Sequence, residues 1–530
     1  MKRTLLLCAL VLSLGVSLRA GEYSGVSTPE TGSSIVVPVV PAAPAFGGNA
    51  AAAAFGSSSL APRSFGAQGT FRAEARIKAM RESLMAGDGA FDNGMAARDA
   101  SNNSLGDKLR DAWNRIRGKK GPTPSGRDGD SANVGEPGER VYVTVKASSR
   151  EQRTRAAELG VDIAEIYADR ISGIAHVSSV ERLNKAGLKV LKTESLDRIA
   201  AETFPADDSI YHDYAELTTE LRALAAGNPK VSVFSIGKSL RGRDIWCVRI
   251  NSTEKGQDAS KKPGVVFMGN HHAREHLSVE VPLLLAKNLA NSADAETQKL
   301  LEARDVYIIP MVNPDGAEYD VYNDEIAGQP NPKKSGYRMW RKNMAKNADG
   351  SYGVDLNRNY GYGWNTGGSS DDGRDETYHG PSAFSEPETR AIRDFVVARP
   401  NLKVLLSYHT FSELILYPWG GKSEPITDPR DRSTYETMAK TMAGWNGYTP
   451  EQSSELYIAS GDTTDWAWGE KKIFSFTFEL TPKSMWNGGF YPGAGVVNST
   501  FQANLKPALY LIGLADNPYK VLDNGNGSSK

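Results

Sequence analysis

Val265-Val266-Phe267-Met268 is an apolar run that leads directly into Gly269-Asn270-His271-His272-Ala273-Arg274-Glu275. Such a short run, followed by polar residues, is typical of a buried strand that ends in a turn. Residues three apart lie about one helical turn apart, so His272 and Glu275 can reach a single cation if the turn is tight. The spacing suggests a metal site, and the alternative is a solvated His–Glu pair of the kind that recurs by chance.

A third candidate ligand, His409, follows the run Leu402-Lys403-Val404-Leu405-Leu406-Ser407-Tyr408. The run is typical of a buried strand in a parallel sheet, and open α/β sheets bind ligands beyond the carboxyl ends of their strands. A catalytic zinc usually takes three protein ligands and keeps a fourth position for water. Two strand ends that meet at one metal suggest a zinc hydrolase, against the alternative of a histidine hydrogen-bonded within the core.

A carboxylate ends the run Phe474-Ser475-Phe476-Thr477-Phe478-Glu479-Leu480. Its strict alternation places Glu479 on the face opposite the three phenylalanines. Zinc hydrolysis needs a general base, and a desolvated glutamate has a suitably raised pKa. The residues alone favour the alternative, an edge-strand glutamate that faces solvent.

Eight motifs, three of them containing the residues above, occur in the same order as in a known family. Over about Ser209 to Tyr519 the chain resembles the zinc carboxypeptidases of the carboxypeptidase A/B type. The motifs are Asn270-His271-His272-Ala273-Arg274-Glu275, Val312-Asn313-Pro314-Asp315-Gly316, Trp340-Arg341-Lys342, Gly353-Val354-Asp355-Leu356-Asn357-Arg358-Asn359, Tyr378-His379-Gly380, Ser407-Tyr408-His409, Tyr457-Ile458-Ala459-Ser460-Gly461 and Phe476-Thr477-Phe478-Glu479-Leu480. Chance does not supply so many motifs in the right order.

The resemblance implies a role for each candidate catalytic residue. His272, Glu275 and His409 would ligate one Zn²⁺, and Glu479 would be the general base. Arg341 would be the electrophile, because a guanidinium that stays protonated can hold the oxyanion of a tetrahedral intermediate. Seen alone, Arg341 would be a surface arginine within a basic string.

The resemblance also implies a substrate site for peptide or protein C-termini. Asn357 and Arg358 look like the pair that holds a terminal carboxylate, since arginine binds carboxylate bidentately and asparagine donates a further hydrogen bond. Tyr457 resembles the tyrosine that closes over the bound terminus, and Arg274 resembles a secondary arginine on the substrate side. Together they indicate an exopeptidase.

The pocket for the C-terminal side chain is expected within Gly461-Asp462-Thr463-Thr464-Asp465-Trp466. Thr464 stands at the family's usual deciding position, and the Asp462 carboxylate could pair with a basic side chain, although a turn residue is the alternative. We therefore predict mixed preference for apolar and basic terminal residues, similar to bacterial carboxypeptidase T-like members. Phe411 stands where some relatives carry tyrosine, a change that should tune activity and not abolish it.

The fold class predicted for residues 206–519 is α/β, with a mixed central sheet flanked by helices. Six runs are expected strands: Val231 to Ile236, Ile245 to Ile250, Val265 to Met268, Val306 to Val312, Val404 to Tyr408 and Ile473 to Leu480. Val279 to Asn291, Pro387 to Val397 and Phe501 to Leu514 are expected helices.

Residues 138–200 are predicted to form a small α+β module. Their order of strand, helix, strand, helix, strand looks like the ferredoxin-like prodomains that mask the cleft in this family. Its release by an activating protease would need cleavage near Asp197 to Asp208, where Arg198 is a basic site. A permanent accessory domain is the alternative.

The N-terminal region fits a secreted or periplasmic protein. Residues 1–20 have the basic start, short apolar stretch and small residues of a signal peptide, too short for the ~20 apolar residues of a membrane span. Residues 21–137 are rich in Ala, Gly, Ser and Pro and are predicted to be mostly disordered, and residues 520–530 are a predicted flexible tail. Of the 2 cysteines, Cys8 lies in the signal peptide, so Cys247 is expected to be an unpaired buried thiol.

Other classes of function have weaker support. The chain lacks the Gly-x-Ser-x-Gly motif of serine hydrolases, and its formal net charge of −1 argues against nucleic-acid binding. The acidic cluster Asp371-Asp372-Gly373-Arg374-Asp375-Glu376 could hold calcium but lacks EF-hand spacing. Two rivals remain, a peptidoglycan-stem carboxypeptidase with the same zinc site and a non-enzymatic binding module that keeps the fold. The oligomeric state is not predicted.

Overall fold

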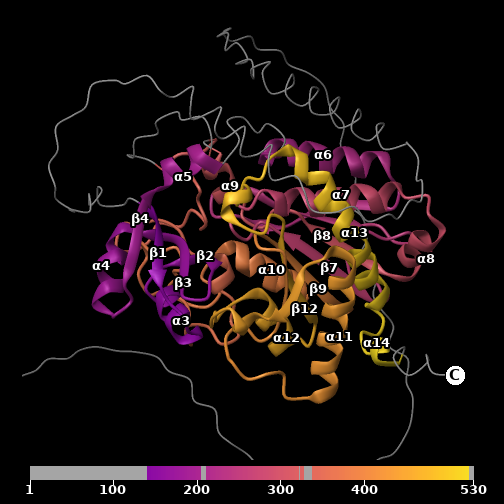
Figure 1. Ribbon diagram of the computed structural model, residues 1–530. Coiled ribbons are helices and arrows are strands. Elements are labelled where there is room, and N and C mark those ends of the chain that lie inside the picture. Colours follow the sequence, from indigo (N-terminus) through magenta and orange to yellow (C-terminus); the bar gives the residue numbers. More distant parts are fainter. Residues whose placement is uncertain (1–139, 204–210, 322, 327–336, 524–530) are drawn as a thin grey trace, which may run out of the picture. The chain divides into compact units, whose positions relative to one another are not determined.

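The computed structural model describes residues 140–203, 211–321, 323–326 and 337–523 (Figure 1). The predicted signal peptide of residues 1–20 and the low-complexity segment 21–137 therefore lie outside the described residues, as does most of the predicted tail. None of the helices in the described ranges is both long and apolar enough to span a membrane.

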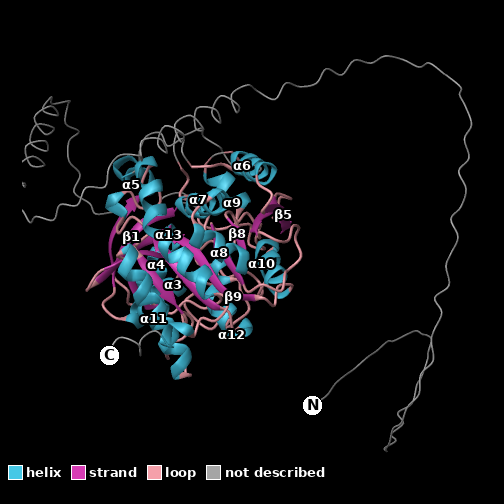
Figure 2. Cartoon of the chain, turned by 90° about the vertical axis from the view of Figure 1, so that its right-hand side faces the viewer, coloured by secondary structure: helices cyan, strands magenta, loops and turns pink. Residues whose placement is uncertain are grey.

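An eight-stranded mixed sheet forms the centre of the larger region, with strand order β11-β10-β12-β9-β7-β8-β6-β5. Figure 2 shows strands in magenta with helices in cyan around them. The four middle strands of the sheet, β12, β9, β7 and β8, are parallel, and antiparallel pairs join β10 to β12, β8 to β6 and β6 to β5. The strands are β5 Val231–Lys238, β6 Asp244–Ile250, β7 Gly264–Gly269, β8 Asp305–Ile309, β9 Leu402–Thr410, β10 Leu414–Tyr417, β11 Thr449–Gln452 and β12 Phe474–Leu480.

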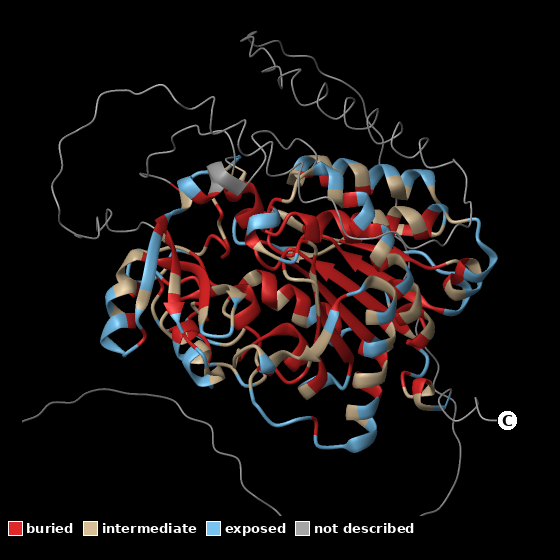
Figure 3. Cartoon of the chain, in the orientation of Figure 1, coloured by how far each residue is buried: buried red, intermediate tan, exposed pale blue. Residues whose placement is uncertain are grey.

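Helices pack against both faces of this sheet, which confirms the predicted α/β class. They are α6 Tyr214–Gly227, α7 Leu277–Asn291, α8 Ala295–Ala303, α9 Pro314–Asp320, α10 Pro387–Val397, α11 Pro429–Asn446, α12 Thr463–Lys471, α13 Val497–Leu514 and α14 Lys520–Asp523. Alternate residues of β7 enter different cores: Phe267 joins the core with α7, α11 and α13, whereas Met268 joins the core with α10 and α12. The middle strands are accordingly buried on both faces, in red at the centre of Figure 3.

A second, antiparallel sheet of order β2-β3-β1-β4 lies in the N-terminal part of the described chain. Its elements are β1 Arg140–Lys146, α3 Arg150–Glu158, β2 Asp162–Ile166, β3 Arg170–His176, α4 Val177–Lys185 and β4 Val190–Ser195, and α5 Leu196–Thr203 follows them. The two helices cover one face through apolar contacts that include Val143, Ala156 and Leu183. This βαββαβ arrangement is the predicted ferredoxin-like α+β module, called the N-terminal module below.

Several expected boundaries differ from the structure. The strand predicted over Val306 to Val312 ends at Ile309 because Pro310 has no N–H for the ladder. The short strands β10 and β11 were not predicted; Pro450 lies inside β11, at the edge of the sheet where proline is tolerated. Helix α11 was also missed, although Asp428 caps its first turn and Gly447 ends it with φ of 75°.

Strand register brings the candidate residues to one edge of the sheet. In the parallel ladder of β12 and β9, Glu479 stands directly opposite His409. Gly269, the last residue of β7, pairs with Tyr408, so the turn that carries His272 begins beside His409. The carboxyl ends of three adjacent strands therefore supply the predicted metal ligands and the predicted base.

Cys247 lies in β6, is fully buried and is free, as expected. Burial raises the pKa of its thiol to about 12, so the reactive thiolate is disfavoured.

A buried ionic cluster fixes the start of the larger region. His212 Nδ1 lies 2.8 and 2.9 Å from the two oxygens of Glu280, and His212 Nε2 lies 3.0 Å from Glu220 Oε1. Lys287 forms a further ion pair with Glu220. Burial opposes the charge on His212, but Glu280 and Glu220 raise its pKa from 6.5 to about 10. Both ring nitrogens therefore donate, and the imidazole is an imidazolium at neutral pH.

We expect His212→Gln to lower the free energy of unfolding by about 3 kcal/mol below pH 6.5, because it leaves buried carboxylates unpaired. Since the folded pKa is raised, this stabilisation is complete below pH 6.5 and is lost as the pH rises through about 10. Denaturant titrations of both proteins at the two ends of this range measure the effect. A difference that does not shrink in alkali would contradict the ionic role, and Glu296→Gln, which removes an exposed ion pair with Lys299, is the control.

Candidate active site

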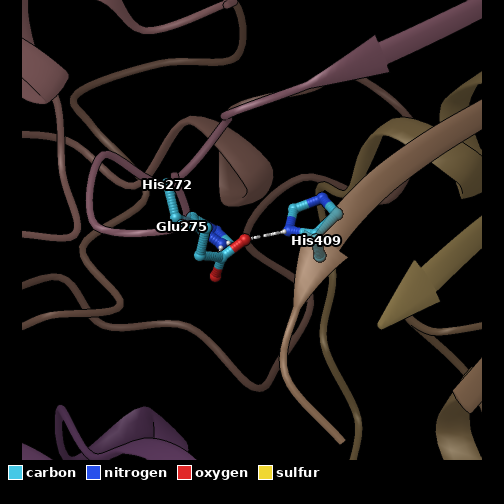
Figure 4. Close-up of side chains that lie close together, drawn as sticks. All are labelled: His272, Glu275 and His409. Atoms are coloured by element: carbon cyan, nitrogen blue, oxygen red, sulfur yellow. Dashed lines mark hydrogen bonds and ion pairs between the residues drawn. The ribbon is translucent and has the colours of Figure 1, made fainter. Parts of the chain in front are cut away.

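Three buried side chains form the predicted metal site: His272 and Glu275 from the turn after β7, and His409 from β9 (Figure 4). Glu275 Oε1 lies 2.8 Å from His272 Nδ1, and Glu275 Oε2 lies 3.0 Å from His409 Nδ1. The two Nδ1 atoms are 3.1 Å apart. Within the described ranges, this is the single group of three or more His, Cys, Asp or Glu side chains whose ligand atoms lie within 4.8 Å of one another.

The surroundings of the two imidazoles suit a divalent cation. His272 Nε2 lies 3.2 Å from Asp355 Oδ1, and His409 Nε2 lies 3.1 Å from Ser407 Oγ. These acceptors place each ring proton on Nε2, which leaves both Nδ1 lone pairs directed at the same point. Burial opposes ionisation of Glu275, but the two imidazoles lower its pKa well below the usual range. Two imidazole nitrogens and one carboxylate are a donor set that fits zinc.

Asp355 joins the metal site to Arg341. Its Oδ1 faces His272, while its Oδ2 accepts hydrogen bonds from Arg341 Nε at 3.1 Å and Nη2 at 2.9 Å. Burial works against this carboxylate, but Arg341 and His272 hold its pKa well below the usual range. One carboxylate therefore orients a ligand and the predicted electrophile together.

Glu479 lies beside the three predicted ligands and is partly buried. Removal from water and the charge of Glu275 raise its pKa to about 8. A divalent cation held by the ligands would oppose the second effect. A carboxylate of this basicity can take up and return a proton near neutral pH.

The predicted carboxylate-binding pair lies on the 3₁₀ turn η1 Leu356–Arg358. Asn357 Oδ1 accepts hydrogen bonds from the backbone N–H and the hydroxyl of Thr463, at 3.0 and 2.8 Å. Arg358 Nη1 donates to the Asn357 carbonyl, while its buried Nε has no hydrogen-bond partner in the structure. A buried cation with an unpaired donor is suited to an anion, since leaving such a donor unpaired is costly.

A single cavity of about 390 Å³ is bordered by ten of the eleven predicted site residues. These are His272, Glu275, Arg341, Asn357, Arg358, His409, Tyr457, Asp462, Thr464 and Glu479. Phe411, the predicted departure, also borders it and packs edge-on against Phe490 with ring centroids 5.0 Å apart. Arg274 does not border the cavity, because its buried guanidinium lies over the Phe490 ring and pairs with Glu376.

Asp462 has a structural task besides the one predicted. Its Oδ1 accepts hydrogen bonds from the Asp465 N–H and the Thr464 hydroxyl, so it caps the first turn of α12. It also borders the cavity, and burial raises its pKa. The turn role and the pocket role, which stood as alternatives, are thus compatible.

The N-terminal module supplies another wall of the cavity through Asp162, Ile163, Ala164, Glu165, Ile166 and Tyr167. Asp162 forms ion pairs with two of the three predicted arginines, at 2.9 Å to Arg341 Nη1 and more closely to Arg274 Nη2. Sequence reasoning missed Asp162, because nothing in the module's own sequence indicates which strand faces the enzyme.

Carboxylates of the acidic cluster considered for calcium form ion pairs with arginines. Arg182 of the module pairs with Asp372 and Asp375, and Glu376 pairs with Arg274 and, at 3.8 Å, with Arg140. These contacts account for the buried carboxylates without calcium.

Comparisons with known proteins agree with this geometry. A profile of the zinc carboxypeptidase family matches residues 217–506. The chain belongs to this family. It is 35% identical over 391 residues to a zinc carboxypeptidase of Saccharothrix mutabilis subsp. capreolus, covering 69% of this chain and 87% of that protein. It is 32% identical over 284 residues to carboxypeptidase B of Astacus astacus, covering 52% and 87%. Among solved structures, carboxypeptidase A of Helicoverpa armigera aligns with a TM-score of 0.58 and 26% identity, over 72% of this chain and 98% of that one.

The family membership makes this chain a zinc metallocarboxypeptidase, a peptide hydrolase that uses one Zn²⁺ and acts on peptide C-termini. Two residues near the metal site received no role from sequence reasoning, Asp355 and His271. Both stand inside the motifs given above, but Asp355 contacts His272 and His271 contacts Tyr360, and each pair joins segments more than 80 positions apart.

Proposed function

We propose that this zinc carboxypeptidase is secreted as a zymogen and releases single C-terminal residues, both apolar and basic. The observation that carries the proposal is one cavity shared by the metal triad and the Asn357–Arg358 pair. A carboxylate bound by that pair would place only the last peptide bond of a chain near the triad. The geometry thus favours an exopeptidase over an endopeptidase.

Each side chain has a defined part in the proposed chemistry. His272, Glu275 and His409 hold the zinc, which when bound acts as a Lewis acid toward the scissile carbonyl and a water. Glu479 takes a proton from the attacking water and returns it to the leaving amine. Arg341, held by Asp355, donates to the developing oxyanion. Tyr457 at the cavity wall closes over the bound terminus.

The N-terminal module acts as the inhibitory prodomain in this proposal. Asp162 neutralises Arg341 Nη1, the donor that a substrate carbonyl would need, and also pairs with Arg274. A peptide therefore cannot engage these arginines until Asp162 leaves. Activation needs cleavage of the connection after the module, by a separate protease or by the enzyme itself.

The region suggested for cleavage lies partly in α5. Arg198 is inside this helix and pairs with Glu194 at 3.7 Å, so cleavage there requires the helix to open. Residues 204–210 lie outside the described ranges. Secretion rests on the signal peptide predicted for residues 1–20.

The test of this function is hydrolysis of peptides that end in Phe, Leu, Lys, Arg or Glu, before and after limited proteolysis. We expect chelator-sensitive release of Phe, Leu, Lys and Arg, with little release of Glu.

Asp462→Asn should slow the release of Lys and Arg alone, about tenfold or more, because the amide keeps the helix cap but cannot pair with a buried ammonium. Equal losses of rate on all substrates would show that Asp462 does not select basic residues.

The same assay on the wild-type protein tests the rival functions. Turnover of muropeptides alone would favour the peptidoglycan-stem rival, and no turnover would favour the binding module.

Glu479→Gln should bind zinc normally but lower kcat by several orders of magnitude, because the amide cannot accept the proton. Steady-state kinetics and metal content of the proteolysed protein measure both. Near-normal turnover would overturn the assignment of the base. Glu451→Gln, another carboxylate that borders the cavity, is the matched control.

Asp162→Ala in the full chain should raise activity before proteolysis by at least about tenfold, since losing one partner of a buried charge pair costs ~2–5 kcal/mol of docking. Peptide hydrolysis by the intact variant measures this, and Asp169→Ala, an exposed carboxylate of the same module, is the control. Unchanged low activity of the intact variant, together with full activity after proteolysis, would show that Asp162 is not the inhibitory contact.

A further inference from the structure

His271 stands behind the metal site and is completely buried. It is not one of the clustered ligands, although its ring stacks on His409 with centroids 5.6 Å apart and planes 12° apart. Its side-chain hydrogen-bond partners are the hydroxyls of Ser407, Thr463 and Tyr360, none of them a carboxylate, so this buried ring is the neutral imidazole. A neutral imidazole has one donor nitrogen and one acceptor nitrogen, and both are in contact with polar groups.

One side of this ring is connected to the metal site. Ser407 Oγ lies 3.1 Å from His409 Nε2 and 3.3 Å from His271 Nδ1. Because His409 directs Nδ1 at the other ligands, its proton is on Nε2 and is donated to Ser407. The serine hydroxyl can then donate to His271 Nδ1, which fixes the His271 proton on Nε2.

The other side of the ring is connected to the carboxylate site. His271 Nε2 lies 3.1 Å from Thr463 Oγ1 and 2.9 Å from the Tyr360 hydroxyl. Thr463 Oγ1 can accept a hydrogen bond from His271 Nε2–H, and its own hydroxyl proton is donated to Asn357 Oδ1 at 2.8 Å, alongside the Thr463 N–H. Because two donors contact the same amide atom of Asn357, that atom is the acceptor Oδ1 and not Nδ2. The NH₂ group is then left to face the cavity.

We propose that His271 is a positioning residue that serves the metal site and the carboxylate site together. A continuous hydrogen-bond chain runs from His409 through Ser407, His271 and Thr463 to Asn357. In this chain Ser407 positions the metal ligand His409, Thr463 positions Asn357, and His271 hydrogen-bonds to both Ser407 and Thr463. The two Thr463 donors at Asn357 Oδ1 leave the amide N–H groups, and not the amide oxygen, for a substrate carboxylate. This inference rests on the proposed function for the role of Asn357.

The chain can be cut on either side of His271. Ser407→Ala removes the link to the metal ligand, Thr463→Val removes the link to Asn357, and His271→Leu removes both. Tyr360→Phe is the matched control, since it removes a hydroxyl that contacts His271 but lies outside the chain. Two quantities separate the effects: zinc affinity of the full chain by competition with a chelator, and, after limited proteolysis, the kcat and KM for one peptide as free acid and as C-terminal amide.

We expect Ser407→Ala to weaken zinc binding about tenfold or more and to leave the preference for the free acid unchanged. Thr463→Val should leave zinc affinity within about twofold and reduce the free-acid preference about tenfold, mainly through KM. His271→Leu should show both losses, and Tyr360→Phe neither. If His271→Leu fails to fold, the two flanking variants still decide.

The proposal is overturned if Thr463→Val keeps the free-acid preference, if Ser407→Ala keeps zinc affinity, or if Tyr360→Phe reproduces their losses. Failure of the proposed function would look different. A proteolysed wild-type enzyme that does not prefer the free acid would remove the role of Asn357 itself, whatever the variants do.

Discussion

Parallel pairing of β7, β9 and β12 is the constraint on which the site depends. Because the three strands run in one direction, their carboxyl ends meet at one edge, and the register sets Glu479 beside His409 and the turn of His272 beside both. Burial of these strands on both faces makes that register rigid. His272 and His409, 137 positions apart in the chain, are thus held with Glu275 so that their ligand atoms lie within 4.8 Å of one another.

Buried charge is the second organising feature. Glu275, Asp355 and Arg341 each have a partner of opposite charge or an imidazole beside them, because an isolated charge away from water is costly. Within the enzyme, Asp355 pairs with Arg341 Nη2 and accepts from His272 Nε2. Asp162 of the N-terminal module pairs with the other terminal nitrogen of Arg341, Nη1. The module is held by donors that the proposed mechanism uses, so in the proposed zymogen the module and a substrate would compete for one set of contacts.

The N-terminal module also buries apolar surface against the enzyme. Tyr142, Ile174 and Ile199 pack with Phe411 and Phe490 near the cavity. The module thus contacts the enzyme through both ion pairs and apolar side chains. In the proposed connection, the His271 imidazole links the metal ligand His409 to Asn357 through Ser407 and Thr463, and it adds no buried charge.

The sequence by itself determined the class of fold, and it pointed to the proposed ligands, base and carboxylate pair, because each stands in a motif whose spacing or family resemblance is local. It also determined the βαββαβ order of the module. The sequence pattern did not predict boundaries set by single residues, such as the end of β8 before Pro310, or short edge strands such as β11. The tertiary structure alone decided the partners: Asp162 with Arg341, Asp355 with His272, and His271 with Thr463. Those contacts join segments far apart in the chain, and only strand register and the docking of the module bring them together.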